Sequence, residues 1–145
     1  MATDRSFIEQ NRAATERIRA IAALPDDALR LPVSEHWTVA ITLAHLAFWD
    51  RRVLAVLDET ERAGRLTCPQ IDFSVNDIAL PFWAAMPPRV AAELAVGAAA
   101  ALDGRLAAFP PALLDELRVH NERWVVRAIH RNAHLDEVDA ALAAR

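Results

Sequence analysis

The sequence has 145 residues, of which 54% are hydrophobic and three are glycine, so its composition favours helices over strands. Acidic residues outnumber basic ones by 20 to 16, and the net charge of -4 argues against nucleic acid as a partner, because phosphate binding needs a basic surface. Every basic residue is arginine, which excludes Schiff-base catalysis on a lysine. We expect one all-α domain over residues 1–145.

Two absences predict where the protein resides. No uncharged apolar run approaches the length of about 18 residues that a membrane span needs, and the N-terminal MATDRSFIEQ lacks the apolar core of a signal peptide. The single cysteine, Cys68, cannot form an internal disulfide, which agrees with a reducing compartment. We therefore expect a cytoplasmic protein with no membrane segment.

The first two helices are predicted from their ends and their apolar periods. Ser6 and Glu9 have capping-box spacing, which predicts a helix from about residue 5 to 23 that Pro25 closes. Its buried face is expected to hold Phe7, Asn11, Ala14, Ile18 and Ile21. After a polar loop, Thr38 is a good N-cap for a second helix that ends near Gly64.

The rest of the chain predicts a long connection and two further helices. Residues 66–87 contain three prolines and no clean period, although FSVNDIAL suits a short helix, so we expect a long, partly helical crossover. Pro88 begins a third helix that ends before Pro110, and its apolar repeat is Val90, Leu94, Ala98, Ala101 or Leu102, Leu106 and Phe109. The last helix is expected over residues 122–143, after a short connector that carries His120. The predicted fold is a four-helix bundle with one long crossover between the second and third long helices.

Three histidines form a candidate metal site. His130 and His134 are one turn apart on the last helix, with Cβ atoms roughly 5–6 Å from each other, so both rings can reach one ion. His45 faces the bundle interior, where each ring nitrogen needs a partner and a metal would satisfy one of them. Arg131 stands where the HExxH motif has its glutamate, and no ExxH pair is present. These features narrow the candidate to a mononuclear site with three histidine ligands.

Ordinary explanations compete with the metal site. A single histidine on an apolar helix face is more often a hydrogen-bonded core residue than a ligand, and the pair at i and i+4 is the stronger signal. His36 is expected at the surface, Cys68 as an ordinary half-buried thiol, and Trp37 and Trp49 in a pocket wall. Whether His120 or Cys68 contributes to the site stays open.

Three arginines lie near the expected site. Arg52, Arg123 and Arg127 have azimuths similar to those of the histidines and could bind a carboxylate in bidentate fashion. Solvated arginines with stems packed on the bundle surface are the more common arrangement. The three arginines are therefore not assigned to the site, and catalytic residues stay unassigned as well.

These motifs resemble a known family. The run HWTVAITLAHLAFWDRR, in which His45 follows Thr38 by seven residues, and HRNAHLDEV near the C-terminus resemble the DinB/YfiT-like superfamily of metalloenzymes. IDFSVNDI is similar to the Asp and Asn of the subgroup near mycothiol-dependent maleylpyruvate isomerase. The resemblance implies a four-helix bundle that binds a divalent ion, usually zinc or nickel, through the positions of His45, His130 and His134. It also implies chemistry with low-molecular-weight thiols, such as mycothiol or bacillithiol, or hydrolysis at the same metal.

The site allows more than one function. Three neutral imidazoles leave an ion with an open position, which a water could take for hydrolysis or a thiol could take for S-transfer to a small electrophile. No general base is evident beside the histidines, which favours the thiol. A non-catalytic bundle that sequesters a metal or a small molecule is the alternative from another class. The chain is too short for the additional C-terminal domain of some mycothiol-dependent isomerases, so we do not expect that specific activity.

One assembly is predicted. Ala-rich stretches such as AVGAAAAL can leave a flat apolar face after the bundle closes, and symmetric dimers are the commonest assemblies. We therefore expect a homodimer. Apart from this second copy of the chain, we expect a small-molecule substrate to bind.

Overall fold

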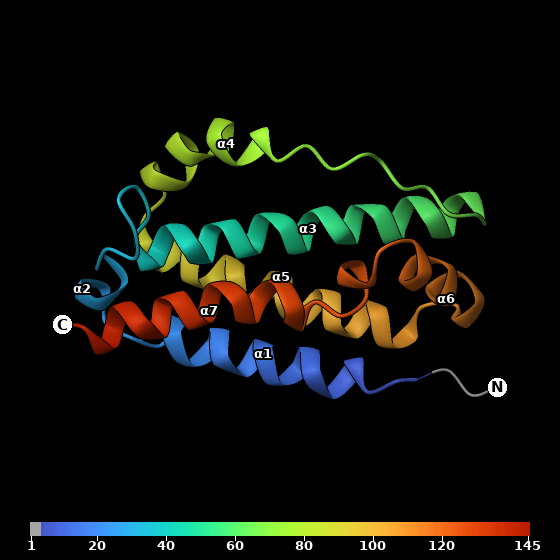
Figure 1. Ribbon diagram of the computed structural model, residues 1–145, viewed down its shortest axis with the longest axis horizontal. Helices are drawn as coiled ribbons and strands as arrows, with labels where there is room; N and C mark the ends of the chain where they lie inside the picture. Colours follow the sequence, from blue (N-terminus) through green and yellow to red (C-terminus); the bar gives the residue numbers. More distant parts are fainter. Residues whose placement is uncertain (1–3) are drawn as a thin grey trace.

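A computed structural model describes residues 4–145 and shows an all-α protein, as the composition predicts (Figure 1). Its α-helices are α1 (Phe7–Ala22), α2 (Asp26–Leu29), α3 (Val39–Ala63), α4 (Ser74–Ala85), α5 (Pro88–Ala108), α6 (Pro111–His120) and α7 (Ala128–Ala143), with a 3-10 turn, η1, at Glu122–Trp124. Within the described residues there is no β-strand, only one isolated bridge between Pro32 and Thr38. No helix in this part of the chain has both the length and the apolar character that a membrane span needs.

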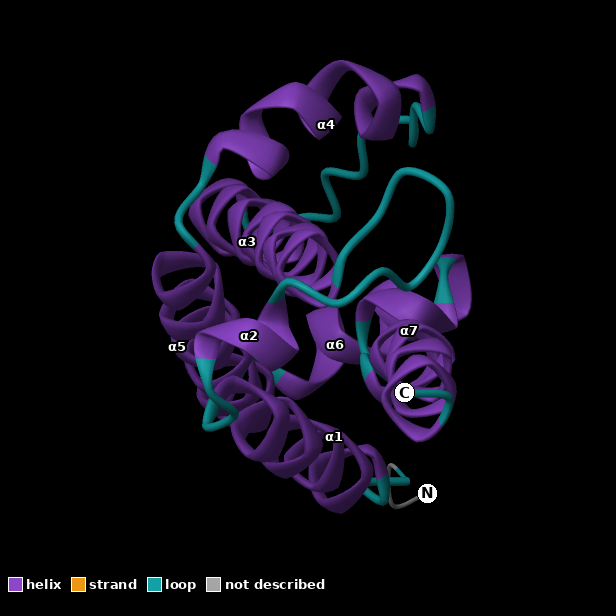
Figure 2. Cartoon of the chain, turned by 90° about the vertical axis from the view of Figure 1, so that its left-hand side faces the viewer, coloured by secondary structure: helices purple, strands orange, loops and turns teal. Residues whose placement is uncertain are grey.

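The four longest helices lie side by side. Helix α3 packs on α5, α5 on α1, α1 on α7, and α7 on α3, so each has two long neighbours (Figure 2). The connection over residues 64–87, which contains α4, returns along the length of α3, so that α3 and α5 run in the same direction (Figure 1). It is the longest of the connections between the long helices, at the predicted place.

The predicted ends of the second helix are confirmed, whereas the cap of the first is wrong. The Thr38 side chain accepts a hydrogen bond from the Ile41 amide at 3.1 Å, and Gly64 ends α3 with a φ of 68°, the left-handed conformation that favours glycine. Ser6 makes no side-chain cap; its own amide donates to Asp4 Oδ1 at 2.9 Å. The capping box is absent because Ser6 already has helical backbone angles.

Helix α5 buries a different face from the one predicted over its first half. Val90 and Leu94 are exposed, while the buried residues are Ala91, Ala92, Ala95, Ala98, Ala99, Leu102 and Leu106. Alanine lets two helix backbones approach closely, so the alanine face of α5 packs inward and leaves the larger side chains outside. The second half of the predicted repeat, from Ala98 through Leu102 to Phe109, is buried as expected.

The connectors contain more helix than predicted. The polar loop after Pro25 includes α2, α4 extends through Pro81 to Ala85, and the connector that carries His120 is the ten-residue helix α6. Proline is tolerated within α4 because the helix is largely exposed, and water can satisfy the backbone group that loses its partner. Leu114 and Leu117 are buried and fix α6 against the body of the protein.

The last helix begins six residues later than predicted, because a side chain of α1 interrupts it. Asn11 Nδ2 donates to the carbonyl of Val125 at 2.9 Å, and Asn11 Oδ1 accepts from the amide of Ala128 at 2.9 Å. The buried amide thus satisfies backbone groups that a continuous helix over residues 122–143 would pair internally. This break determines where α7 begins and therefore where its histidines lie.

The apolar core consists of two clusters. One contains Ile18, Leu46, Ala99 and Leu135, and the other contains Phe7, Val53, Leu102 and Ala128. Along each long helix, the residues of one cluster precede those of the other. Buried polar residues lie between them in sequence, including Thr15 on α1, Asp50 on α3 and Arg131 on α7.

Candidate metal centre

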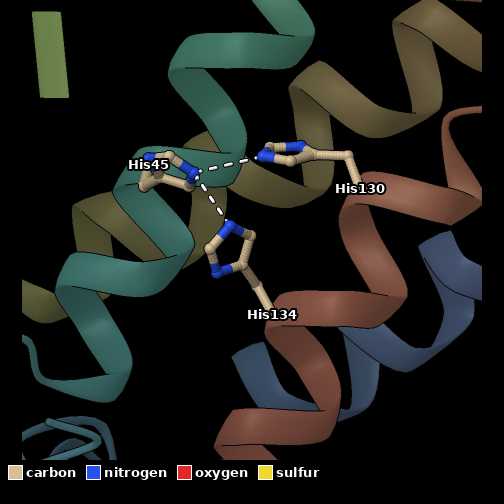
Figure 3. A group of neighbouring side chains, drawn as sticks. All are labelled: His45, His130 and His134. Atoms are coloured by element: carbon tan, nitrogen blue, oxygen red, sulfur yellow. Dashed lines mark hydrogen bonds between the residues drawn. The ribbon is translucent and has the colours of Figure 1, made fainter. Parts of the chain in front are cut away.

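Three imidazole rings converge between α3 and α7 (Figure 3). His45 is buried in the N-terminal third of α3, and His130 and His134 are half-buried on successive turns of α7. His45 Nε2 lies 3.1 Å from His130 Nε2 and 3.1 Å from His134 Nε2. The structure therefore brings together the three predicted residues in a group that could hold a metal ion.

The spacing of these nitrogens suits one ion. A tetrahedral zinc ion with bonds of about 2.0–2.1 Å holds its ligand nitrogens about 3.3–3.4 Å apart. The two measured separations of 3.1 Å differ from this spacing by a few tenths of an ångström. The ligand atoms of all three rings lie within 4.8 Å of one another, so the group could hold one ion.

The same contacts cannot all be good hydrogen bonds between neutral rings. His45 Nε2 has either a proton or a lone pair, and it has a close ring nitrogen on two sides. If it donates to one neighbour, it cannot accept from the other with that same atom. A cation at the centre would accept a lone pair from each nitrogen, so the donor set fits a metal better than it fits three free imidazoles.

The outer nitrogens of the three rings differ. His134 Nδ1 lies 3.3 Å from Glu137 Oε1, which accepts its proton and leaves Nε2 free for a metal. His45 Nδ1 is buried without a hydrogen-bond partner among the described residues. His130 Nδ1 lies 3.1 Å from Arg127 Nη2, which can only donate, so the His130 proton lies on Nε2 in this arrangement. Ligation by His130 Nε2 would require Arg127 to release this contact.

Burial keeps the rings neutral. Desolvation, and then the nearby His134 and Arg127, lower the pKa of His45 from 6.5 to about 3. Desolvation, followed by the charge of Arg127, lowers the pKa of His130 to about 2. Burial also lowers the pKa of His134, while Glu137 opposes the change. Neutral imidazole is the form that binds metal, so the site has this form well below neutral pH.

Tryptophan rings surround the histidines. The Trp37 ring centroid lies 4.8 Å from that of His45 and 6.0 Å from that of His134, with which it is stacked. Trp83 contacts His45 edge-on, with centroids 5.3 Å apart. Trp49 Nε1 donates to Asn76 Oδ1 at 2.8 Å and so ties the crossover to α3. These rings restrict the histidine rotamers and shield them from water.

A cavity of about 500 Å³ opens onto the three histidines. Its wall includes Trp37 and Trp49, as predicted, and also Trp124. Asp72 is the only carboxylate among its lining residues, whereas Arg52, Arg123 and Arg127 all line it. Within residues 4–145, the guanidinium groups of Arg52 and Arg123 have no hydrogen-bond or ion-pair partner. The cavity therefore offers free positive charge beside the histidines.

Arg127 is not a solvated arginine. It is buried, and its Nε donates to Asp50 Oδ1 at 2.9 Å. The other oxygen of Asp50 accepts from Arg131 Nε, also at 2.9 Å. The sequence contains a signal for the buried Asp50–Arg131 pair, namely a charged residue at an apolar position of a helical repeat. Asp50 follows Leu43 and Leu46 in the heptad pattern of α3, and Arg131 occupies an apolar position of α7.

The remaining candidates lie outside the three-histidine group. His36 is exposed near Glu35, as predicted. His120 is exposed at the end of α6, beside Trp124, and it does not line the cavity. Cys68 is half-buried, as expected, and desolvation raises the pKa of its thiol, which does not suit a nucleophile.

Comparison with known proteins identifies the family. The mycothiol maleylpyruvate isomerase N-terminal domain family matches residues 11–141, and this domain is of the DinB/YfiT-like type that the motifs resemble. No curated protein and no solved structure matches the chain. The match covers most of α1 through most of α7 and includes all three converging histidines.

Proposed function

The chain belongs to the mycothiol maleylpyruvate isomerase N-terminal domain family, and on this basis we propose that it is a metal-dependent enzyme that joins a low-molecular-weight thiol to a small electrophile. His45, His130 and His134 hold one divalent ion, with zinc or nickel expected because both suit imidazole ligands. The observation that carries the proposal is the convergence of three neutral imidazoles at the wall of a cavity. Three protein ligands leave a position open, as in catalytic sites.

The metal and the protein would have separate tasks. When bound, the ion lowers the pKa of a thiol that ligates it and so supplies a thiolate at neutral pH. In the transfer, the sulfur forms a bond to the electrophilic carbon, the thiol proton passes to solvent, and the displaced electron pair departs with the leaving group. Trp37, Trp49 and Trp124 form an apolar part of the wall of the cavity in which the transfer would take place.

The free arginines favour an anionic electrophile. Arg52 and Arg123 line the same cavity as the histidines and have no partner in the described chain, so either can bind a carboxylate. The one lining carboxylate, Asp72, accepts hydrogen bonds from the amide and hydroxyl of Ser74. We therefore propose that an anionic group of the electrophile lies between the two arginines.

A thiol is favoured over water as the nucleophile. Hydrolysis would need a general base near the open position, and the nearby carboxylates are engaged, Asp72 with Ser74 and Glu137 with His134. A thiol that is deprotonated on binding needs no such base. Metal-dependent hydrolysis and metal sequestration without turnover remain the outcomes that the experiment must distinguish.

The test uses zinc-loaded protein, mycothiol and two matched probes, chloroacetate and chloroacetamide. We expect thioether formation faster than in the uncatalysed reaction, with greater acceleration for the anionic chloroacetate. His45→Ala should lose the acceleration and His36→Ala should retain it. Formation of glycolate without thiol would favour the hydrolase, and no acceleration with either probe would contradict the proposed transfer.

A further inference from the structure

One side chain of α7 contacts all three of the other long helices. Arg131 Nε donates to Asp50 Oδ2 of α3 at 2.9 Å. Its Nη1 donates to the Asn11 carbonyl and to Thr15 Oγ1 of α1, both at 3.1 Å, and to Asp103 Oδ1 of α5 at 2.8 Å. The Arg131 side chain is fully buried, with an exposed fraction of 0%. Its guanidinium therefore links α7 to α1, α3 and α5.

This group lies between the two apolar clusters of the core. On α7, Arg131 stands between Ala128 of one cluster and Leu135 of the other, and on α3 Asp50 stands between Ala47 and Val53 in the same way. Apolar side chains pack adequately in several registers, whereas a buried guanidinium is satisfied only where its acceptors lie. This polar layer, made of Arg131 and the groups that accept its hydrogen bonds, therefore selects one axial position and one rotation of α7 relative to its neighbours.

The same layer adjoins the histidines. Arg131 follows His130 directly, and Asp50 lies on the helix that carries His45. We propose that Arg131 is the positioning residue of the three-histidine centre, because its bonds to α1, α3 and α5 place His130 and His134 against His45. The proposal rests on the proposed function only for its metal readout, since the placement of the rings can be measured without a metal.

A contribution to stability alone explains the buried ion pairs of Arg131 less well than a role in setting the helix register. A buried ion pair loses hydration from both charges, and apolar side chains of similar volume often stabilise a core as well or better. A unique helix register, by contrast, is something that apolar packing does not supply. Of the two Arg131 carboxylates, Asp50 also binds Arg127, so removal of Arg131 leaves Asp50 with a partner.

The test compares Arg131→Met with a matched control, Arg17→Met. Arg17 also joins α1 to α7, through Asn132, Asp136 and Asp139, but on the more exposed side. Two quantities are measured in each folded variant: the zinc dissociation constant, and nuclear Overhauser contacts between the His45 and His134 rings in the metal-free protein. The two ring centroids lie 4.5 Å apart in the structure.

We expect Arg131→Met to lose the ring contacts and to bind zinc about 10–100-fold more weakly, and Arg17→Met to retain both properties. Retention of the contacts and the affinity in Arg131→Met would overturn the proposal. If the wild-type protein binds no zinc and the ring contacts are nevertheless lost in Arg131→Met, the positioning role stands and the metal function is rejected. A second variant, Arg131→Met with Asp103→Asn, removes the carboxylate that loses its guanidinium. If neither variant folds while Arg17→Met does, Arg131 is required for folding itself and the positioning role is rejected.

Discussion

His45 Nε2 on α3 lies 3.1 Å from His134 Nε2 on α7, although the two residues are 89 positions apart in the chain. A buried ring and a half-buried ring thus meet between the two helices. A third ring nitrogen, His130 Nε2, is equally close to His45.

The metal-free protein should lose stability in acid. The pKa values of His45, about 3, and His130, about 2, lie below the ordinary value of 6.5 that these rings regain on unfolding. Between these values the unfolded chain binds protons that the folded chain does not, so stability is full above about pH 6.5 and falls as the pH decreases toward 3. The loss is up to about 1.4 kcal/mol per pH unit for each ring. Urea unfolding of chelator-treated protein between pH 7.5 and 4.5 measures it.

A matched pair of variants isolates the buried histidines in that measurement. His45→Phe removes one buried ring that resists protonation, so its stability should fall less steeply with acid than that of the wild type. His36→Ala changes an exposed histidine and should preserve the wild-type slope. Parallel slopes for wild type and His45→Phe would show that His45 is not the origin of the acid sensitivity.

Arg127→Gln should tighten metal binding. Arg127 donates toward His130 Nδ1, and this contact opposes the tautomer that a metal needs, whereas a glutamine carbonyl can accept the Nδ1 proton. Asp50 keeps Arg131 as a partner in this variant. We expect zinc affinity to increase about tenfold, since outer contacts of ligating histidines change affinity on that scale. Competition with a chromogenic chelator measures the change, and Arg127→Met, which has no acceptor, serves as the control.

A smaller gain for Arg127→Gln than for Arg127→Met would contradict the role of the acceptor. Nitrogen spectra of the metal-free wild type provide an independent check. They should show the His130 proton on Nε2 and the His134 proton on Nδ1.

Arg52→Gln and Arg123→Gln should weaken the use of anionic electrophiles. Each substitution removes one unpaired charge from the cavity wall but retains much of the side-chain volume. We expect KM for chloroacetate to increase about tenfold, with kcat changed little and with chloroacetamide unaffected, because a charged hydrogen bond contributes on the order of 1.5 kcal/mol. Steady-state kinetics with the two probes separate charge recognition from general damage. An equal effect on both probes would reject the carboxylate site.

The sequence predicts the parts of this site that depend on helical period. The i and i+4 spacing of His130 and His134 is sufficient to place both rings on one face, and the apolar neighbours of His45 indicate that it is buried. Thr38 and Gly64 mark the ends of α3 because their conformational preferences are local. These features depend on a few neighbouring residues, which is why they are correct.

Other features depend on partners far away in the chain. Asn11 interrupts the last helix from 114 positions away, and no property of residues 122–128 reveals it. Val90 and Leu94 fit the predicted stripe of α5, yet they are exposed because close packing favours the alanine face. Asp50 and Arg131 occupy apolar positions of two different helices, and each buried charge is explained only by its ion pair with the other. Charged residues at core positions of a heptad are the signal that could have identified this pair.

All three histidines should contribute to the affinity for zinc. His45→Ala, His130→Ala and His134→Ala each remove one of the converging nitrogens, so each should weaken binding by at least about 100-fold. His36→Ala should bind one zinc ion per chain as the wild type does. Calorimetric titration of metal-free protein gives the stoichiometry and affinity together. Unchanged affinity in any of the three site variants would remove that residue from the ligand set.

The most direct test of the three-histidine centre is X-ray absorption at the zinc edge on zinc-loaded protein. We predict a first shell that contains three imidazole nitrogens at about 2.0–2.1 Å, together with one exchangeable ligand. Addition of mycothiol should introduce a sulfur into that shell. A shell with fewer than three imidazoles, or one that contains sulfur from Cys68 before any thiol is added, would contradict the site and the function proposed for it.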